Sequence, residues 1–355
     1  MNEPKHLWKL FTADEEYSNQ RLDKFNRHLY AQSGNAHVLE PLVSQYLCNN
    51  GLSVKYPDGK KFALCLTHDI DVLYTNQSAL QQLRTGIKNA ITFNIKGVKK
   101  SITKALRKTI EPDYHIHNIL NAGKKYNAKS SFYFLSLTQG EQDFNYDPKE
   151  IKEIFELIKN NDGEIGLHGG HMAYNNPAKM KSEKTLLEYA ANKKVNGYRN
   201  HYLKFQTPAT WEFLNDAGFI YDTTFGYADN AGFRNGMCHP FQPYSLTRNG
   251  FLDIIELPLV IMDVTLWRYM KLSQAQQYAL CTALIDTVAD CNGVLTLLWH
   301  NTQMCGYEGE LYGRILEYAN TKNAWMTSAI EIVDHWKANK YHEAVNEILL
   351  QLNSE

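Results

Sequence analysis

A short apolar segment that ends in ionisable side chains limits what this chain can fold into more than any other feature. Residues 62–66, Phe-Ala-Leu-Cys-Leu, have the composition of a buried strand, and Thr-His-Asp-Ile-Asp follows directly at 67–71. In α/β folds the loops at the carboxyl ends of strands carry the chemistry. Asp69 and Asp71 are close enough for one to act as a base while the other binds a metal ion. The alternative is an ordinary aspartate-rich turn.

Two further apolar segments end in histidine. Residues 163–171, Gly-Glu-Ile-Gly-Leu-His-Gly-Gly-His, place His168 and His171 three positions apart, and residues 293–300 form a buried type of strand that ends at His300. Imidazole and carboxylate ligands suit Zn²⁺ or another first-row divalent ion better than calcium. One such histidine alone is more often a structural residue, but three strand ends of this kind predict one shared site.

These motifs, in this order, resemble the polysaccharide deacetylase superfamily of carbohydrate esterases. That family has an Asp-Asp pair after its first strand, a two-histidine motif, an Arg-x-Pro-Tyr motif and a late strand ending in Leu-x-His. The matching segments here are 67–71, 168–171, Arg-Asn-His-Tyr at 199–202 and Leu-Leu-Trp-His at 297–300. The resemblance covers roughly residues 60–305 and is strongest to the branch with a Thr-His-Asp-x-Asp opening. It implies an α/β fold, a deformed seven-stranded (β/α) barrel.

The resemblance also implies catalytic roles for three residues. Asp69 takes the family's base position and would accept a proton from water, and His300 would protonate the leaving amine or alcohol. Arg199 would hold Asp69 through a charge-assisted hydrogen bond.

Two departures from the family pattern affect the expected metal site. The acids are separated by one residue, so Asp71 is the expected metal ligand together with His168. The family's second histidine lies four residues after the first, where this chain has Met172. His171, one residue earlier, therefore competes for the third ligand position with His201, which replaces the proline of the third motif. The expected cofactor is a divalent metal ion, Zn²⁺.

Two residues are expected to contact substrate. Tyr202 ends the third motif, and Arg234 belongs to the glycine-rich and aromatic stretch 221–241, which resembles the loop that lies over the substrate in this branch. Arg234 could hold a carboxylate or phosphate bidentately, or it could be an ordinary exposed arginine. Asp263 follows another predicted strand and would either orient the catalytic histidine or cap the next helix.

Composition narrows the cellular setting. A formal net charge of −1 over 355 residues argues against a protein that coats nucleic acid. The first nine residues lack the apolar core of a signal peptide. The cysteines are scattered and include no CxxC pair, which indicates reduced thiols and predicts a cytoplasmic protein. They are Cys48, Cys65, Cys238, Cys281, Cys291 and Cys305. This location favours a soluble or lipid-linked glycan precursor as substrate.

The chain is expected to have three parts. Residues 1–59 form an N-terminal helical extension, 60–310 the barrel with a basic helical insert at 72–117, and 311–355 the C-terminal helices. Residues 72–110 contain no acidic side chain but eight Lys or Arg, with apolar residues at helical spacing. The stretch 84–108 therefore predicts a peripheral contact with a membrane surface, unless it is the solvated face of a packed helix.

Taken with the resemblance, these features predict a metal-dependent hydrolase that removes an acyl group, expected to be acetyl, from a sugar or glycan precursor. Two alternatives remain at the level of sequence. One is a hydrolase of a non-sugar C–N bond on the same scaffold, since a fold does not fix its substrate. The other is a binding protein for anionic glycans or lipid-linked precursors without turnover.

Overall fold

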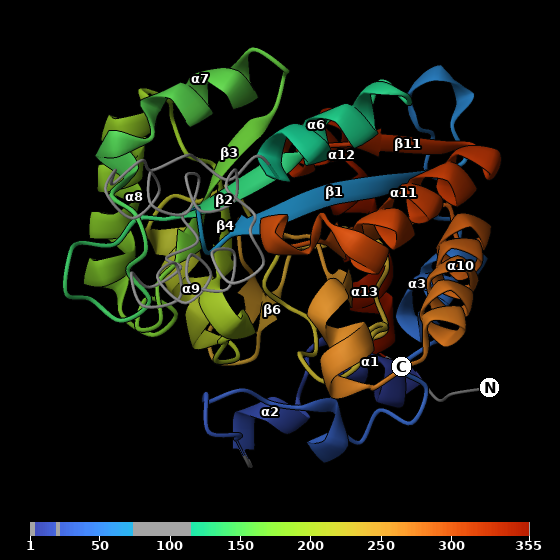
Figure 1. The fold of residues 1–355 in the computed structure, drawn as a ribbon. Coiled ribbons are helices and arrows are strands. Elements are labelled where there is room, and N and C mark those ends of the chain that lie inside the picture. The colour runs from blue at the N-terminus through green and yellow to red at the C-terminus, as the bar shows by residue number, and fades with distance from the viewer. Residues whose placement is uncertain (1–3, 19–21, 74–114, 355) are drawn as a thin grey trace, which may run out of the picture.

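The computed structural model describes residues 4–18, 22–73 and 115–354 (Figure 1). The basic insert expected at 72–117 lies mostly outside these residues, and the membrane contact expected through 84–108 lies wholly outside them. Within the described ranges, no helix is both long enough and apolar enough to cross a bilayer.

A curled parallel sheet forms the centre of the molecule. Over the described residues it has nine strands, in the order β8-β5-β4-β3-β2-β1-β10-β9, with β11 paired to β1 as well. Nearly every residue of these strands is buried, because both faces of the parallel sheet are covered. Their bounds are β1 (Phe62–Ile70), β2 (Ser131–Leu135), β3 (Glu164–Gly169), β4 (Gly197–Asn200), β5 (Tyr221–Asp222), β8 (Ile255–Glu256), β9 (Leu259–Met262), β10 (Val294–Leu298) and β11 (Ala324–Thr327).

One bent segment joins the two ends of this sheet. Strands β8 and β9 are separated only by Leu257 and Pro258, yet β8 pairs with β5 and β9 pairs with β10. Proline cannot donate to a strand ladder, which fits the break between the two halves. The pairing of β9 with β10 also shifts register between Thr296 and Leu297, a bulge that adds curvature. Counted as one bent strand, β8 and β9 make the curled path seven-stranded, and the expected seven-stranded (β/α) barrel is confirmed.

Helices cover the outside of the barrel (Figure 1). Local sequence explains the ends of several of them. In α8 the side chain of Asn176 accepts a hydrogen bond from Lys179 N at 3.1 Å, Pro177 occupies the first turn, and Asn192 ends the helix in the left-handed region. The barrel helices are α6 (His115–Lys124), α7 (Lys152–Lys159), α8 (Pro177–Ala191), α9 (Ala209–Asp216), α10 (Gln274–Asp290), α11 (Gly306–Thr321), α12 (Ala329–Ala338) and α13 (Tyr341–Ser354).

Short elements occupy the connections. A two-stranded hairpin consists of β6 (Tyr244–Ser245) and β7 (Gly250–Phe251). Single turns of helix are η1 (Tyr30–Gln32), η2 (Pro57–Gly59), η3 (Pro148–Glu150), η4 (His201–Leu203), η5 (Thr265–Tyr269) and η6 (Asn301–Gln303). Of these, η4, η5 and η6 follow the carboxyl ends of β4, β9 and β10 and so border the same end of the barrel.

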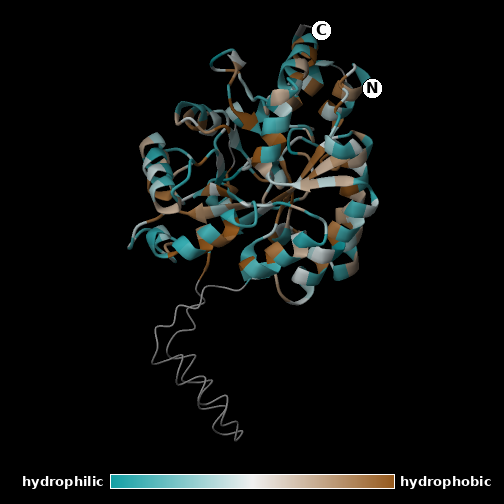
Figure 2. Cartoon of the chain, turned by 90° about the horizontal axis from the view of Figure 1, so that it is seen from above, coloured by the Kyte–Doolittle hydropathy of each residue, from teal (hydrophilic) through white to brown (hydrophobic). Residues whose placement is uncertain are grey.

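The N-terminal extension packs on the barrel. It contains α1 (Pro4–Phe11), α2 (Glu15–Ser18) and α3 (Leu42–Asn49). Trp8 lies edge-on to Tyr244 with ring centroids 4.9 Å apart, and Phe11 lies edge-on to Phe241 at 5.5 Å. Helix α1 also lies against α13, so the two ends of the chain meet (Figure 1). Apolar residues concentrate on the inner strands and the inward helix faces (Figure 2).

The C-terminal segment differs from its expectation. Residues 311–355 were expected to be helical, but Ala324–Thr327 form β11, which pairs in parallel with Phe62–Cys65 of β1. The flanking sequence has helical periodicity, so these four residues could not be recognised as a strand. They pair with the first half of β1, and β2 pairs with its second half.

Candidate metal centre and active site

The candidate residues meet because parallel strands place their carboxyl ends at the same rim. Asp69 lies in β1, Asp71 directly follows it, and His168 lies in β3. Arg199 of β4 is the register partner of His168. His300 comes two residues after the end of β10, which pairs with β1 on its other side. Five positions spread over more than 200 residues of sequence thereby reach one end of the barrel.

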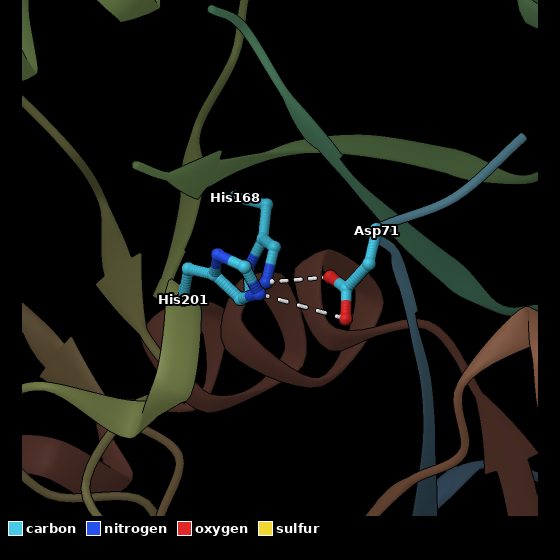
Figure 3. Close-up of side chains that lie close together, drawn as sticks. All are labelled: Asp71, His168 and His201. Atoms are coloured by element: carbon cyan, nitrogen blue, oxygen red, sulfur yellow. Dashed lines mark ion pairs between the residues drawn. The ribbon is translucent and has the colours of Figure 1, made fainter. Parts of the chain in front are cut away.

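Asp71, His168 and His201 form a compact group that can hold a metal ion. Figure 3 shows the two imidazole rings turned towards the carboxylate. His168 Nε2 lies 3.1 Å from Asp71 Oδ1, and His201 Nε2 lies 3.6 Å from Asp71 Oδ2. All three ligand atoms are within 4.8 Å of one another. Ligand atoms at zinc-binding distance from a tetrahedral ion lie about 3.3 Å apart, so the donors fit this coordination.

The hydrogen bonding of His168 supports a cation at this position. Its Nδ1 lies 3.0 Å from the carbonyl oxygen of Arg199, which fixes the proton on Nδ1. Its buried Nε2 has no hydrogen-bond partner among the described residues, and neither has the facing Asp71 Oδ1. A lone pair directed at a carboxylate is unfavourable unless a cation lies between them. The donor set thus fits a divalent ion.

The electrostatic field of the group also favours positive charge. Burial would lower the pKa of His201, but the carboxylates of Asp71 and Asp143 outweigh burial and raise that pKa to about 9. Burial would raise the pKa of Asp71, but His201 and His168 hold it well below its usual value. A metal ion would satisfy the same field while displacing the proton of His201.

Asp143 supports His201 from outside the group, and the sequence analysis missed it. Its Oδ2 lies 3.4 Å from His201 Nδ1, the arrangement by which a carboxylate commonly orients a metal-binding imidazole. The residue lies in an irregular loop between β2 and α7, where a lone acid in a polar stretch gives no signal in the sequence.

Asp69 is held by Arg199. The guanidinium Nη1 donates to Asp69 Oδ1 at 3.2 Å and to Thr67 Oγ1 at 2.8 Å, and Nε donates to the carbonyl of Thr223 at 3.1 Å. Arg199 is completely buried and Asp69 nearly so. This arrangement holds the Asp69 carboxyl group in a fixed position against the buried guanidinium. Its Oδ2 lies 3.6 Å from His168 Nε2, beside the metal-binding group.

His300 is held by Asp263 on the other side of the site. His300 Nδ1 lies 2.7 Å from Asp263 Oδ1, and the backbone N–H of His300 donates to Asp263 Oδ2 at 2.7 Å. The sequence left two roles open for Asp263, and the structure places it against the histidine. Burial would lower the pKa of His300, but Asp263 outweighs burial and raises it to about 10. The other ring nitrogen, Nε2, lies 3.7 Å from Asp71 Oδ2 and faces the site.

A cavity of about 500 Å³ opens onto these groups. Asp69, Asp71, His201 and His300 line it together with residues of η5 and η6. Another part of its wall comes from residues 23–29 of the N-terminal extension.

Tyr202 lies in this cavity wall, as expected for a substrate contact. Its ring stacks on His201, with centroids 4.0 Å apart, and on Phe25 of the extension at 4.9 Å. Its backbone φ of +61° is in the left-handed region, and Leu203 follows at +54°. Two such non-glycine residues in succession are strained, a feature that clusters at functional sites. This turn directs the rings of His201 and Tyr202 to the same side.

Two expected site residues lie elsewhere. His171 is outside the metal-binding group, with its Nδ1 3.8 Å from Asp143 Oδ2. Arg234 lies outside the cavity, which corrects the expectation that it holds a substrate anion. Its buried guanidinium donates from Nε and Nη2 to the two carboxylate oxygens of Glu16, at 2.8 and 2.7 Å. A loop arginine with no acidic neighbour in sequence could not be recognised as half of this long-range ion pair.

Comparison with known proteins supports the fold. No protein-family model and no curated protein matches the sequence. A crystal structure of a protein assigned to the polysaccharide deacetylases, from Mycobacterium smegmatis, superposes with a TM-score of 0.55 at 18% identity and covers 81% of this chain and 94% of that one. The crystal structure of PuuE allantoinase superposes with a TM-score of 0.54 at 13% identity, over 80% of this chain and 92% of that one. The chain therefore has the fold of the polysaccharide deacetylase superfamily.

Proposed function

We propose that this protein is a metal-dependent hydrolase that removes an acyl group, most simply acetyl, from an amino sugar or another glycan precursor. One observation carries the proposal. The group formed by Asp71, His168 and His201 is flanked by the Asp69–Arg199 pair on one side and the His300–Asp263 pair on the other. The cavity reaches this arrangement at Asp69, Asp71, His201 and His300. A carboxylate and an imidazole placed on either side of an ion are suited to general base and general acid roles.

The residues divide the reaction between them. A divalent ion, Zn²⁺ in this proposal, would be held by Asp71, His168 and His201 and would supply polarisation of the acyl carbonyl. Asp69 accepts the proton of the attacking water, and Arg199 keeps its carboxylate oriented. His300 donates the proton on Nε2 to the leaving nitrogen or oxygen as the bond to the acyl carbon breaks. The products are the free amine or alcohol and the carboxylic acid. Asp69 then releases its proton to solvent and His300 takes one up, which restores the starting state of both residues.

The proposed setting is the cytoplasm, with a soluble or lipid-linked glycan precursor as substrate. All six cysteines are free in the structure, which supports a reducing compartment. The acid-free stretch 84–108 supports a peripheral contact with an anionic membrane surface. Nucleic acid is not part of the proposal.

Metal analysis combined with product release tests the function. The purified protein is expected to contain about one divalent ion per chain by mass spectrometry and to release acetate from N- or O-acetylated sugars. Asp69→Asn is expected to keep the ion and lose roughly 10²-fold or more in rate, the usual effect of removing a positioned base. Since one similar fold belongs to an allantoinase, allantoin is included in the substrate panel.

Other outcomes select the alternatives. Hydrolysis of allantoin without acetate release would replace the sugar substrate with a non-sugar C–N bond. If the protein binds glycans, binds no metal and hydrolyses no acylated sugar, it is a binding protein. An Asp69→Asn variant that loses the ion would move Asp69 from the base role to a metal-binding role.

A further inference from the structure

A segment of the N-terminal extension, residues 22–33, forms one wall of the active-site cavity; we call it the N-terminal strap. A tight turn within it is fixed by Asp23. Asp23 Oδ1 accepts hydrogen bonds from the backbone N–H groups of Phe25 at 2.9 Å and Arg27 at 3.0 Å. Asp23 Oδ2 accepts from Arg27 Nη2 at 2.7 Å. The turn is therefore closed on itself by both backbone and side-chain bonds.

The same arginine fastens the strap to the barrel. Arg27 Nη1 donates to the carbonyl of Tyr202 at 3.2 Å, and Nη2 donates to the hydroxyl of Tyr269 at 3.2 Å. The ring of Phe25 stacks almost parallel on Tyr202, at an interplanar angle of 8°. Tyr202 in turn stacks on His201 of the metal-binding group. The strap is thus a fixed wall in direct contact with the catalytic end of the barrel.

The charged side chains that line the cavity differ in whether they have an oppositely charged partner. Each carboxylate has a positive partner: Asp23 pairs with Arg27, Asp69 with Arg199, and Asp71 lies against the imidazoles of the metal-binding group. Two exposed cations, Lys24 of the strap and Arg268 of η5, also line the cavity. Within the described ranges of the chain, no carboxylate lies within 4.0 Å of either one, although exposed lysines elsewhere have such partners.

We propose that the substrate is an anionic sugar derivative, whose phosphate or carboxylate is bound by Lys24 and Arg268 while its acyl group lies at the metal centre. This inference rests on the proposed hydrolase function and extends it to a substrate class. Asp69 and Asp71 disfavour a second anion beside them, so the anion binds at the two unpaired cations. A cavity of about 500 Å³ is within the size range of ligand pockets.

Binding to a slow variant tests the charge preference apart from catalysis. Full-length Asp69→Asn protein loaded with Zn²⁺ is titrated calorimetrically with N-acetylglucosamine 1-phosphate, an N-acetylhexosaminuronic acid and neutral N-acetylglucosamine. At least one anionic sugar is expected to bind tenfold or more tighter than the neutral one, the order of magnitude for hydrogen bonds to charged groups. The phosphate and carboxylate sugars show which anion is recognised.

Variants assign this preference to the two cations. Lys24→Gln with Arg268→Gln is expected to remove the tenfold preference and leave binding of the neutral sugar unchanged. Lys149→Gln serves as the matched control, because Lys149 is exposed and lies outside the cavity lining. Lys24→Glu, a charge reversal on the exposed strap, is expected to weaken the anionic sugar further.

The outcomes separate this inference from the proposed function. Charge-dependent binding that disappears in the double variant supports the inference even if the wild-type protein releases no acetate, which would defeat the proposed function alone. Equal affinity for neutral and anionic sugars would overturn the inference. So would a preference that persists in the double variant, or wild-type deacetylation of neutral and anionic sugars with the same kcat/KM.

Discussion

Each reactive side chain of the candidate site is held by a second, buried side chain. Arg199 holds Asp69, Asp263 holds His300, and these contacts span 130 and 37 residues of sequence. A free imidazole or carboxylate at a cavity wall would sample several rotamers. The partners reduce this freedom, so the site is organised before a substrate enters it.

Asp263→Asn tests the orientation of His300. The variant removes the carboxylate that accepts the Nδ1 proton of His300, so we expect kcat to fall about 10- to 100-fold, as is common for such supporting residues. Bound metal should remain near one ion per chain, because Asp263 belongs to no metal-ligand group in the described structure. Asp290→Asn, an exposed carboxylate, is the control. Loss of metal together with activity would place Asp263 in a different role.

His201→Ala and His171→Ala distinguish the two histidines that competed for the third ligand position. His201 faces Asp71, whereas His171 lies outside the group. We expect His201→Ala, like His168→Ala, to lower bound metal tenfold or more, and His171→Ala to retain it. Metal content measured by mass spectrometry after dialysis decides between them. Full occupancy in His201→Ala would exclude that histidine as a ligand.

The sequence could predict the residues at strand ends but not the partners that hold them. Asp69, Asp71, His168 and His300 follow apolar runs, so local pattern and family resemblance identified them together. The choice of His201 over His171 depends on the left-handed turn at residues 202–203, which sequence alone does not reveal. Asp143 reaches the site from an irregular loop and has no such pattern.

At the level of elements, strand length and curvature set the shape of the rim. β1 has nine residues and pairs with β11 at its start, β2 at its end and β10 on the other edge. The parallel repeat was predictable because strands and helices alternate with clear periodicity. The sequence could not predict the two-residue strand β5 or the split of β8 from β9, because these elements are defined by their pairing partners and not by local composition.

Glu183 of α8 links this helix to the end of β3 and makes stability depend on pH. Its Oε2 accepts the Gly170 N–H at 2.8 Å, and burial raises its pKa from 4.5 to about 7. The folded state therefore holds the proton more tightly, so this group's stabilisation is complete below pH 4.5 and is lost as pH rises through about 7.

Glu183→Gln should remove this dependence of stability on pH. The difference between the free energies of unfolding of the variant and the wild type is expected to rise by roughly 3 kcal/mol from pH 4.5 to pH 8, because only the wild type loses this stabilisation. Urea denaturation at several pH values measures it. Glu153→Gln on the exposed side of α7 is the control and should run parallel to the wild type. A pH-independent difference for Glu183→Gln would mean that folding does not shift the pKa of this carboxyl group.

In the molecule as a whole, the N-terminal extension is part of the active-site structure. The strap lines the cavity, and Glu16 just before it pairs with Arg234 inside the barrel loops. A helical extension packed on the barrel could be predicted from the sequence, because residues 1–59 are too few for a separate binding domain. The sequence could not predict the ion pair, whose members are 218 residues apart, or the stacking of Phe25 on Tyr202.

Glu16→Gln tests whether extension and barrel unfold as one unit. Glu16 and Arg234 are 4% and 2% exposed at their side chains, so neutralising Glu16 leaves a buried guanidinium without its counter-charge. We expect the free energy of unfolding to fall by about 3–5 kcal/mol, with a single transition retained in urea. Glu343→Gln, which breaks the exposed pair with Lys340, should cost less than about 1 kcal/mol. A second transition at low urea in Glu16→Gln, with the main transition unchanged, would show that the extension unfolds separately and that the barrel does not depend on it.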